Sequence, residues 1–568
     1  MRQLYRILLG GALVCAMVMG AAQSSNAQNI TTGTLTGVVM DAQKGVLPGA
    51  TVTAVHTPTG TTYEAVTQAD GHFTMLAVRV GGPYTVKATM SGFKTEEQTN
   101  VIVALGESRA VDFTLQIAAV SETVNVVASA QIIDTTRAGT AANVAAQAIE
   151  SLPTIQRSIS DFARTSPFFN STVDSANQDY QQISVAGRNN RYNNMQIDGA
   201  VNNDVFGLAS SGTPGGQTST QPINLDAVQE IQLIVSPYDV RQGGFTGGAI
   251  NAVTKSGTNA FHGTGYWFQR NQNLIGVIPS VVSPNSTATP VDVKVGKFKD
   301  RQPGFTLGGP IVQNKAFFFG AAEFPRKATP VGWSADGSSG QQFPNSAAVQ
   351  QVASIAKNQY GYDPGGLGEM SKTNNSDRIF IRGDFNLSPH HQLTARTNYI
   401  NAVADVGGAS ASSYTLPSNY YHMTDRMISS VGQLNSNFGT AFNELRIVYS
   451  RERNVRGNQP GYPSFPQVQV TLPDSTGVYL GTEYASQGNG LNQDIIEATD
   501  DLTLVKGQHT FSIGTHNEFY KFWNLYLPNG YGSYRFSSIA NFQAGIAQSY
   551  NYQYSNYPDT PLWAARFS

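Results

Sequence analysis

Residues 181–259 have the sequence QQISVAGRNNRYNNMQIDGAVNNDVFGLASSGTPGGQTSTQPINLDAVQEIQLIVSPYDVRQGGFTGGAINAVTKSGTN. This stretch is rich in Gly, Asn and Gln, carries little charge, and contains no nucleophile beside a base. Short β-prone runs at 183–186, 231–235 and 249–254 are separated by turn-forming pairs such as Asp198-Gly199, Gly243-Gly244 and Gly247-Gly248. The stretch therefore predicts a compact, polar, β-rich module without catalytic chemistry. Its function must be inferred from the sequence on either side of it.

The composition of the whole chain indicates an exported β-rich protein with several domains. The chain has 568 residues, and 36 Lys and Arg against 38 Asp and Glu give a net charge of −2. This balance gives no electrostatic reason to expect nucleic acid as a partner. Charged residues make up 13% of the chain, about half the usual share. So small a share of charged residues is typical of a protein whose outer surface contacts something other than water.

The N-terminus predicts secretion. Arg2 and Arg6 precede an apolar run at 7–19, and Ser25-Asn26-Ala27 is placed for cleavage, so residues 1–27 are expected to be a signal peptide. The one cysteine, Cys15, lies inside this segment, so the mature chain is expected to have no disulfide. No later run holds about 18 uninterrupted apolar residues. Any crossing of a membrane is therefore expected to use a β-barrel.

Residues 31–118 predict a β-sandwich. Seven strand-like runs occur in fewer than one hundred residues, and Asp70-Gly71 between two of them is a strong hairpin signal. The runs GVVMD at 37–41, GVLPGATV at 45–52 and TQADGHF at 67–73 resemble the carboxypeptidase regulatory-like domain. The resemblance implies a transthyretin-like sandwich without catalytic activity. No histidine of the chain is followed by Glu three residues later, as the zinc signature of carboxypeptidases requires, so an enzyme is not expected.

Residues 119–140 form a joint with two possible interpretations. The run VSETVNVVA at 120–128 is β-prone and could be an eighth strand or an ordinary linker. It is also similar to the TonB box, which precedes the plug of TonB-dependent outer-membrane transporters. An extended segment of this kind can add a strand to the sheet of a partner, so the resemblance implies TonB as a partner. The residues assigned to this segment are Glu122, Thr123, Val124, Asn125 and Val126.

Residues 141–256 are expected to be a plug. A helix-prone run at 141–151 ends before Pro153. The runs GRNNRYNNMQIDG at 187–199, AVQEIQL at 227–233 and GGFTGGAINAVTKSG at 243–257 resemble the plug of TonB-dependent receptors of the Oar-like type. In that family the plug fills the barrel lumen, where glycine allows close backbone approach and polar side chains form hydrogen bonds with the wall. The residues assigned to the plug motif are Gly187, Arg188, Asn194, Asp198, Gly199, Gly247, Gly248, Asn251, Thr254, Lys255 and Gly257.

Other interpretations of the plug residues are less favoured. Asp198, Asn202, Asn203 and Asp204 could supply oxygen ligands to Ca²⁺, but their spacing does not match an EF-hand, so turn chemistry is predicted instead. Buried pairing of Arg188 and Arg191 with carboxylates of the barrel wall is expected rather than contact with an anionic ligand. The segment 243–248 lacks the Lys-Ser/Thr ending of a phosphate loop. Neither a metal nor a cofactor is expected.

Residues 257–568 predict part of an outer-membrane barrel. Outward apolar residues such as Ile379, Ile381 and Leu445 alternate with inward polar ones such as Glu444 and Arg446. Strands of this kind, with short turns at one end and long loops at the other, are typical of outer-membrane barrels. A large soluble β-solenoid or sandwich is the alternative.

The length of this last part limits the number of strands. The family's barrel has about 22 strands, whereas about ten are recognisable here, and a barrel cannot leave its edges unpaired in lipid. An N-terminal portion of a longer receptor, or a truncated gene, is therefore expected.

The combined expectation is a mainly β protein: a transthyretin-like sandwich, an α+β plug, then part of an antiparallel transmembrane barrel. The function predicted is that of a TonB-dependent receptor in the bacterial outer membrane, with its first two domains accessible from the periplasm. It would import an extracellular ligand by TonB-driven movement of the plug. The alternative is an adhesion or secretion-assembly protein of the Oar-like type. The family serves siderophores, cobalamin, oligosaccharides and peptides, and loops such as 271–300 and 329–376 are expected to choose among them.

Overall fold

The computed structural model describes most of the chain after residue 30. The described ranges are 31–117, 124–127, 140–154, 156–173, 181–236, 239–244, 246–275, 277–279, 292–294, 297–338, 341–410, 412–506, 509–554 and 565–567. The expected signal peptide, with Cys15, lies outside them. Among the described residues, no helix is long and apolar enough to cross a membrane.

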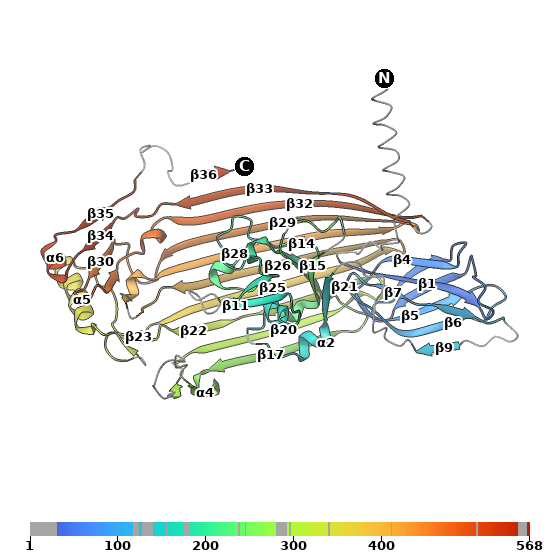
Figure 1. The fold of residues 1–568 in the computed structure, drawn as a ribbon, viewed down its shortest axis with the longest axis horizontal. Helices are drawn as coiled ribbons and strands as arrows, with labels where there is room; N and C mark the ends of the chain where they lie inside the picture. The colour runs from blue at the N-terminus through green and yellow to red at the C-terminus, as the bar shows by residue number, and fades with distance from the viewer. Residues whose placement is uncertain are drawn as a thin grey trace, which may run out of the picture.

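The N-terminal domain, residues 31–117, is a two-sheet sandwich at one end of the molecule (Figure 1). Its core contains Leu35, Phe73, Tyr84 and Phe113, all fully buried, so the predicted sandwich is confirmed. One sheet consists of β1 (Gly33–Asp41), β4 (His72–Val78), β7 (Ser108–Ala110) and β8 (Phe113–Leu115). The other consists of β2 (Thr51–His56), β3 (Thr61–Val66), β5 (Gly81–Thr89), β6 (Glu96–Val103) and β9 (Val124–Val127).

Strand β9 contains part of the segment that resembles a TonB box. Its backbone pairs in parallel with β6, with Val124 opposite Glu96 and Val126 opposite Gln98. Glu122 and Thr123 lie outside the described residues. The described part of the segment is thus an edge strand of the N-terminal domain, as its β-prone sequence predicts.

The central domain, residues 140–256, is built on a five-stranded sheet in the order β10-β15-β16-β13-β14. The prediction of a helix from residue 141 is wrong for its first five residues. Residues 141–145 belong to β10, whose backbone is paired with β15. Val144 of this strand is buried in the hydrophobic core of the central domain. The elements are β10 (Thr140–Ala145), α2 (Ala146–Ser151), α3 (Ile159–Ala163), β11 (Phe169–Val173), β12 (Gln181–Val185), η1 (Asn190–Tyr192), β13 (Asn194–Ile197), β14 (Ala200–Val201), η2 (Gly216–Thr218), η3 (Leu225–Ala227), β15 (Val228–Ser236) and β16 (Ala249–Thr254).

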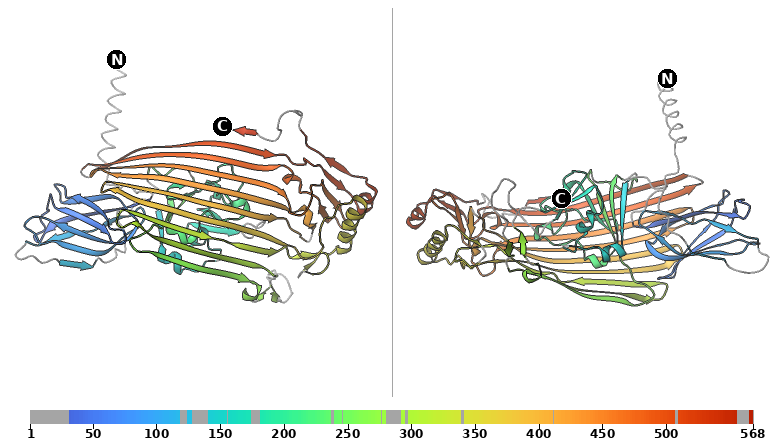
Figure 2. Two further views of the ribbon diagram at one scale, coloured as in Figure 1. Left: turned by 180° about the vertical axis from the view of Figure 1, so that it is seen from behind. Right: turned by 60° about the horizontal axis from the view of Figure 1, so that its bottom comes forward.

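The barrel wall is a curved, antiparallel, 11-stranded sheet that holds the central domain against its inner face (Figures 1 and 2). Exposed Ile381 and Ile447 alternate along their strands with buried inward residues such as Asp384 and Arg446, so the predicted alternation is confirmed. The strands are β17 (His262–Asn271), β20 (Lys299–Val312), β21 (Ala316–Glu323), β22 (Arg326–Pro330), β25 (Ser371–Ser388), β26 (His391–Val406), β28 (Tyr421–Asn437), β29 (Ala441–Asn458), β32 (Asn489–Lys506), β33 (His509–Tyr526) and β36 (Ala565–Phe567).

The two ends of the wall differ. Short turns join the strands at the end that carries the N-terminal domain, whereas the other end carries long insertions that form a cap (Figure 1). In outer-membrane barrels short turns face the periplasm and long loops face outwards, so the cap marks the extracellular end. The cap consists mainly of α5 (Ser346–Tyr360), α6 (Ile539–Ala544), β27 (Ser413–Thr415), β30 (Gln467–Thr471), β31 (Gly477–Leu480), β34 (Ser533–Phe536) and β35 (Ser549–Asn551).

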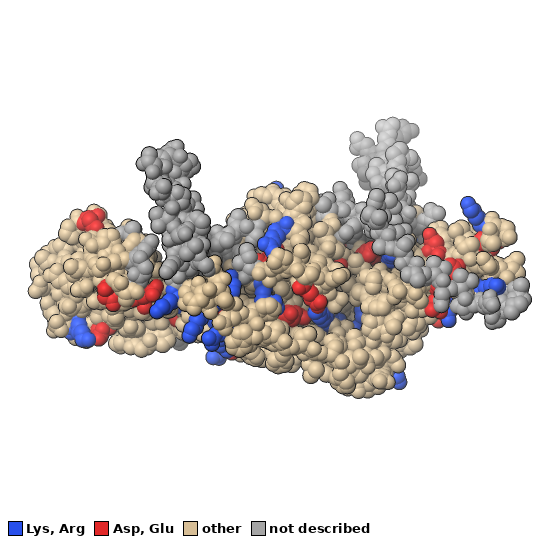
Figure 3. Space-filling model, turned by 90° about the horizontal axis from the view of Figure 1, so that it is seen from below, with Lys and Arg blue, Asp and Glu red and all other residues tan. Residues whose placement is uncertain are grey.

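The cap has its own hydrophobic core, which includes Phe343, Val352, Val470 and Leu480. The long loops expected at 271–300 and 329–376 are therefore partly folded, and α5 lies within the second of them. Seen from below, most of the visible surface is uncharged, with Lys, Arg, Asp and Glu in scattered groups (Figure 3).

Candidate functional site

The central domain is anchored to the barrel wall through Asp198. This residue and Gly199 form the two-residue turn between β13 and β14, with φ angles of 50° and 72°. A two-residue hairpin turn of this type requires positive φ, which Asp and Gly tolerate, so the predicted turn is confirmed. The carboxylate of Asp198 accepts hydrogen bonds from the backbone N and the Oγ1 of Thr254, at 2.8 and 2.9 Å. The turn is thus tied to β16 of its own domain.

Two arginines of the wall hold the same carboxylate from outside the central domain. Arg396 on β26 places its Nε 2.7 Å from Asp198, and Arg382 on β25 places its Nη1 3.6 Å from it. Arg382 also donates to Thr254 Oγ1 at 2.8 Å. Because Asp198 is only 6% exposed, these ion pairs are buried at the contact between domain and wall. Removing one partner of a buried pair leaves an uncompensated charge, so the contact fixes the turn strongly.

A second carboxylate, Asp384 on β25, continues this network towards the periplasmic end. Arg382 donates to both of its oxygens, at 2.9 and 2.7 Å, and Thr394 donates to it at 3.0 Å. A forked pair between a guanidinium and a carboxylate is among the strongest polar contacts in proteins. Arg382 therefore links the Asp198 turn of the central domain to a second carboxylate of the wall.

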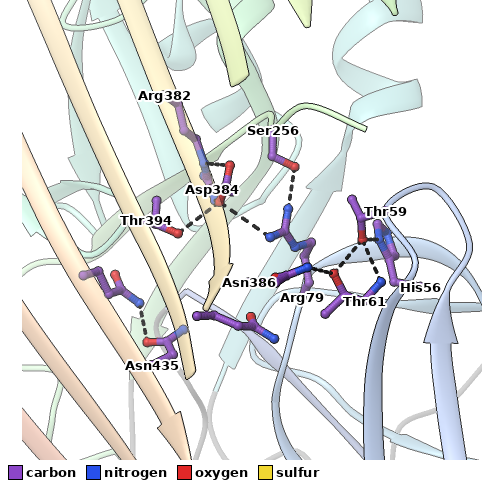
Figure 4. A network of polar contacts seen from close by, with 12 residues as sticks. His56, Thr59, Thr61, Arg79, Ser256, Arg382, Asp384, Asn386, Thr394 and Asn435 are labelled. Atoms are coloured by element: carbon purple, nitrogen blue, oxygen red, sulfur yellow. Dashed lines mark hydrogen bonds and ion pairs between the residues drawn. The ribbon is translucent and has the colours of Figure 1, made fainter. Parts of the chain in front are cut away.

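Arg79 of the N-terminal domain completes the network (Figure 4). Its Nη1 donates to Ser256 Oγ at 2.8 Å, just after β16, and its Nη2 lies 3.6 Å from Asp384. A small polar cavity of about 150 Å³ lies among these side chains and is lined by residues from all three domains. One cation of the first domain thus contacts both the end of the central domain and the wall.

His56 lies beside Arg79 in a chain of hydroxyl contacts (Figure 4). Its Nδ1 lies 2.7 Å from Thr59 Oγ1, which lies 2.8 Å from Thr61 Oγ1, and wall residue Asn386 donates to Thr61 at 3.0 Å. Burial, and then the positive charge of Arg79, lower the pKa of His56 from 6.5 to about 3. His56 is therefore neutral at physiological pH and adds no charge to the junction.

The N-terminal domain also contacts the central domain directly through Leu105. Its backbone N donates to Glu230 at 3.1 Å, and its carbonyl accepts from Asn143 at 2.9 Å and Gln232 at 3.0 Å. Leu105 packs with Val80 and with Val253 of β16 in one buried cluster. These contacts place the N-terminal domain across the periplasmic mouth of the barrel.

At the extracellular side, the loop after β14 contacts the cap-side half of the wall. The backbone N of Gly215 donates to Glu452 at 3.3 Å, and Arg456 donates to Gln217 at 2.7 Å. Asp204 accepts from the backbone N of Gly207 and of Ala209, and burial raises its pKa. Turn chemistry thus explains Asp198 and Asp204. Within the part of the chain that the structure describes, no cluster of three or more His, Cys, Asp and Glu could hold a metal ion.

The prediction that Arg188 and Arg191 pair with buried wall carboxylates is wrong. Both residues are exposed, in the turn region between β12 and β13. At Asp198 the ionic contact has the opposite polarity, because the central domain supplies the carboxylate and the wall supplies the arginines. The predicted polarity occurs at a different arginine, since Arg157 of the central domain lies 3.8 Å from the buried Glu323 of β21. A sequence pattern cannot show which side of an interface carries which charge.

The remaining residues of the plug motif pack the central domain together or, at Gly257, fit the chain against wall strands β20 and β21. A Cβ on Gly248 would lie 2.6 Å from Val185 Cγ1 and 2.8 Å from the carbonyl of Ile234, which explains the glycine. A Cβ on Gly247 or Gly257 would likewise meet backbone or side-chain atoms, and Gly187 has a φ of 79°. Asn194 donates to the carbonyl of Gly243, Asn251 accepts from the backbone N of Gly199, and Lys255 pairs with Glu150.

Sequence reasoning did not assign the wall residues of the Asp198 network to the site. Arg382, Asp384 and Arg396 occupy inward positions of alternating strands, and charged residues at such positions are a signal that could have found them. Nothing in the local sequence distinguishes Arg79.

Comparison with known proteins agrees with this architecture. Residues 34–116 match the carboxypeptidase regulatory-like domain, and residues 253–335 and 334–566 match the outer membrane beta barrel domain. The TonB-dependent transporter Oar of Myxococcus xanthus is 27% identical over 329 residues, which cover 56% of this chain and 28% of Oar. The probable TonB-dependent siderophore receptor PirA of Acinetobacter baumannii is 26% identical over 174 residues, which cover 29% of this chain and 20% of PirA.

A solved structure shares the fold. The outer membrane transporter YddB from Escherichia coli superposes with a TM-score of 0.50 at 13% identity, over 75% of this chain and 52% of YddB. The matched part of the chain thus spans about half of that structure, and less of the two sequence relatives.

Proposed function

This chain belongs to the family of outer membrane β-barrel domains and is homologous to TonB-dependent transporters, and on that premise we propose that it is the gated part of an importing receptor. It lies in the outer membrane. In this proposal the central domain is the plug, an extracellular ligand binds at the cap and the loop after β14, and TonB drives the plug from the periplasm. The protein acts by movement and makes no covalent change in its cargo.

The observation that carries the proposal is the anchor at Asp198. A gate needs contacts that hold it closed and that can be broken without unfolding the wall. The anchor meets this need, because Asp198 belongs to the central domain whereas Arg382 and Arg396 belong to the wall. Water that enters the opening gate would hydrate the separated charges, so the ion pairs can re-form afterwards.

The order of strands in the central sheet supports pulling from the periplasmic side. β10 is an edge strand and is the first element after the segment that resembles a TonB box. Force applied before residue 140 would therefore act on the end of β10 and separate its hydrogen bonds from β15 one after another. The next strand of the sheet after β15 is β16, which carries Thr254, a hydrogen-bond partner of Asp198.

The segment 122–128 provides the test. We expect its deletion from the intact receptor to abolish TonB-dependent accumulation of ligand while binding at the cell surface persists. Deletion of residues 129–135, of the same length in the same joint, is the matched control. The name of PirA supplies the first ligand class to test, a siderophore.

Photo-crosslinking to TonB tests the same segment without the need to know the ligand. A photo-crosslinking residue at Asn125 should form an adduct with TonB in energised cells, and one at residue 132 should not. Equal crosslinking at both positions would contradict the assignment of the TonB box. Surface binding or export without energy-dependent accumulation would favour the adhesion or secretion alternative.

A further inference from the structure

The N-terminal domain extends across the periplasmic ends of several wall strands. Asn386 on β25 donates a hydrogen bond to Thr61 at 3.0 Å, and Gln433 on β28 donates to Thr31 at 3.1 Å. Thr31 in turn donates to Glu444 on β29 at 3.3 Å. The domain is therefore docked on the wall itself as well as on the central domain.

The same domain borders the space beside the anchor at Asp198. The polar cavity of about 150 Å³ is lined by Asp198 and Arg382 of the anchor and also by His56 and Arg79 of the N-terminal domain (Figure 4). A passage that opened there when Asp198 left its arginines would therefore meet the N-terminal domain before it reached the periplasm.

The interface between the N-terminal domain and the rest of the receptor is mostly polar. The domain has a separate hydrophobic core of its own. Polar interfaces between domains permit relative motion, and water can replace the hydrogen bonds that are lost. The sandwich can therefore separate from the wall without unfolding. Among the described residues, the buried apolar contacts across the interface form two small clusters, one of Leu76 and Ala77 with Phe442 and one of Val80 and Leu105 with Val253.

A groove of about 640 Å³ already separates part of the domain from the wall. It lies between strands β3 and β4 on one side and the wall turns at 389–392 and 437–442 on the other. Glu64 and Thr74 line the first side, and His390 and Asn437 line the second. Docking therefore depends on local contacts and not on continuous packing.

Strand β9 connects the segment that resembles a TonB box to this domain. Its backbone pairs in parallel with residues 96–99 of β6, which lies between β5 and β9 in the sheet. No other strand in the described part of the chain pairs with β9. A strand of TonB added to this free edge would become part of the sheet of the N-terminal domain. A pull on β9 would therefore load the domain directly through backbone hydrogen bonds.

We propose that the N-terminal domain is a second gate at the periplasmic mouth, which TonB separates from the wall when it pulls on β9. This inference rests on the proposed function, because it needs TonB to act on this segment. The two gates act in series. Release of Asp198 opens the space beside the central domain, and release of Thr31, Thr61 and Arg79 opens that space to the periplasm.

A disulfide can lock the second gate. The sequence after residue 27 contains no cysteine, so an engineered pair supplies the only thiols. A Cβ on Gly60, in the turn between β2 and β3, would lie 2.9 Å from Asn314 Cγ, in the turn between β20 and β21. Gly60→Cys with Asn314→Cys therefore places two Cβ atoms within the roughly 3.5–4.5 Å that a disulfide requires. We call this double variant the lock.

Two controls accompany the lock. Gly60 and Asn314 have positive φ angles of 65° and 61°, so cysteines there strain the backbone, and the reduced form of the lock controls for that strain. Lys87→Cys with Glu97→Cys is the control pair. These two residues lie opposite each other on β5 and β6, so their disulfide stays inside the N-terminal domain.

The first measurement pulls on the purified intact receptor, which is held at the cap in a lipid nanodisc, with the periplasmic domain of TonB on the cantilever of a force microscope. We expect the reduced lock and the control pair to show an early step, in which the N-terminal domain separates, before the central domain extends. The oxidised lock should lose this step. Persistence of the early step in the oxidised lock, or its absence from every form that TonB holds, would overturn the second gate. Failure of TonB to hold any form would instead contradict the proposed function, and the second gate with it.

The second measurement uses cells in which the unmodified receptor accumulates a siderophore. Oxidation of the lock should abolish accumulation while binding at the cell surface persists, and dithiothreitol should restore accumulation. The control pair should accumulate the siderophore in both its oxidised and its reduced form. Equal accumulation by the oxidised lock and the oxidised control pair would show that cargo passes without separation of the N-terminal domain.

Discussion

Asp198 of the central domain lies 2.7 Å from Arg396 of the wall, and the two residues are separated by almost two hundred positions in the sequence. The contact joins a hairpin turn to an inward position of β26. Arg382 and Thr254 surround the same carboxylate, so one side chain connects the central sheet to two neighbouring wall strands. This connection fixes the position of the central domain against the wall.

Asp198→Asn should loosen the central domain. The substitution keeps the size of the side chain but leaves Arg396 and Arg382 without their shared anion, and breaking a buried pair costs about 3–5 kcal/mol. We expect faster hydrogen exchange in β13, β14 and β16, measured by mass spectrometry on the folded receptor. Asp336→Asn in the exposed part of the cap is the control, and equal exchange in the two variants would contradict the role of the anchor.

Arg79→Gln should release the N-terminal domain from the mouth of the barrel. Its contacts with Ser256 and Asp384 would be lost, while the hydrogen bonds of Leu105 would remain. We expect limited proteolysis to cut the joint at residues 118–139 several times faster. Arg79→Lys, which keeps the charge, should restore part of the protection. Lys87→Gln, at an exposed pair with Glu97, should change nothing.

The stability of the N-terminal domain should depend on pH through His56. Its folded pKa of about 3 lies below the unfolded value of 6.5, so between these values the unfolded state binds more protons. Unfolding is therefore favoured as pH falls below 6.5, by at most about 1.4 kcal/mol for each pH unit. Urea unfolding of the receptor, followed by a probe in this domain, should show this slope from pH 6.5 to 4. His56→Gln should reduce it, and an unchanged slope would show that other groups cause it.

Gly248→Ala should strain the central domain where β16 begins. The new Cβ would meet Val185 and the carbonyl of Ile234, and overpacking of this kind costs about 1–3 kcal/mol. Gly243→Ala is the matched control in the same glycine-rich run, since nothing lies within 4 Å of its Cβ position. The thermal midpoint of the folded receptor should fall for the first variant and remain within error for the second. Equal midpoints would indicate that the strand shifts without cost.

The local sequence predicted the structure correctly where the conformation depends only on neighbouring residues. The alternation around Ile379 and Ile381 predicted which side of β25 is exposed, because successive side chains of a strand point to opposite faces. The pair Asp198-Gly199 predicted a turn, because both residues tolerate positive φ. The run at 141–145 was misassigned because its helix-prone alanines are held in a strand by pairing with β15, and tertiary context overrides such weak preferences.

The sequence by itself determined the sandwich, the polar central domain, the alternating strands and the family resemblance. Only the tertiary structure decided that Asp198 faces Arg396, that Arg79 bridges the first domain to Asp384, that Arg188 and Arg191 remain exposed, and that Arg426 lies opposite Arg453. The physical reason is that turns and alternation depend on neighbouring residues. Charge pairing instead depends on strand register and domain docking, which bring together residues from distant parts of the chain.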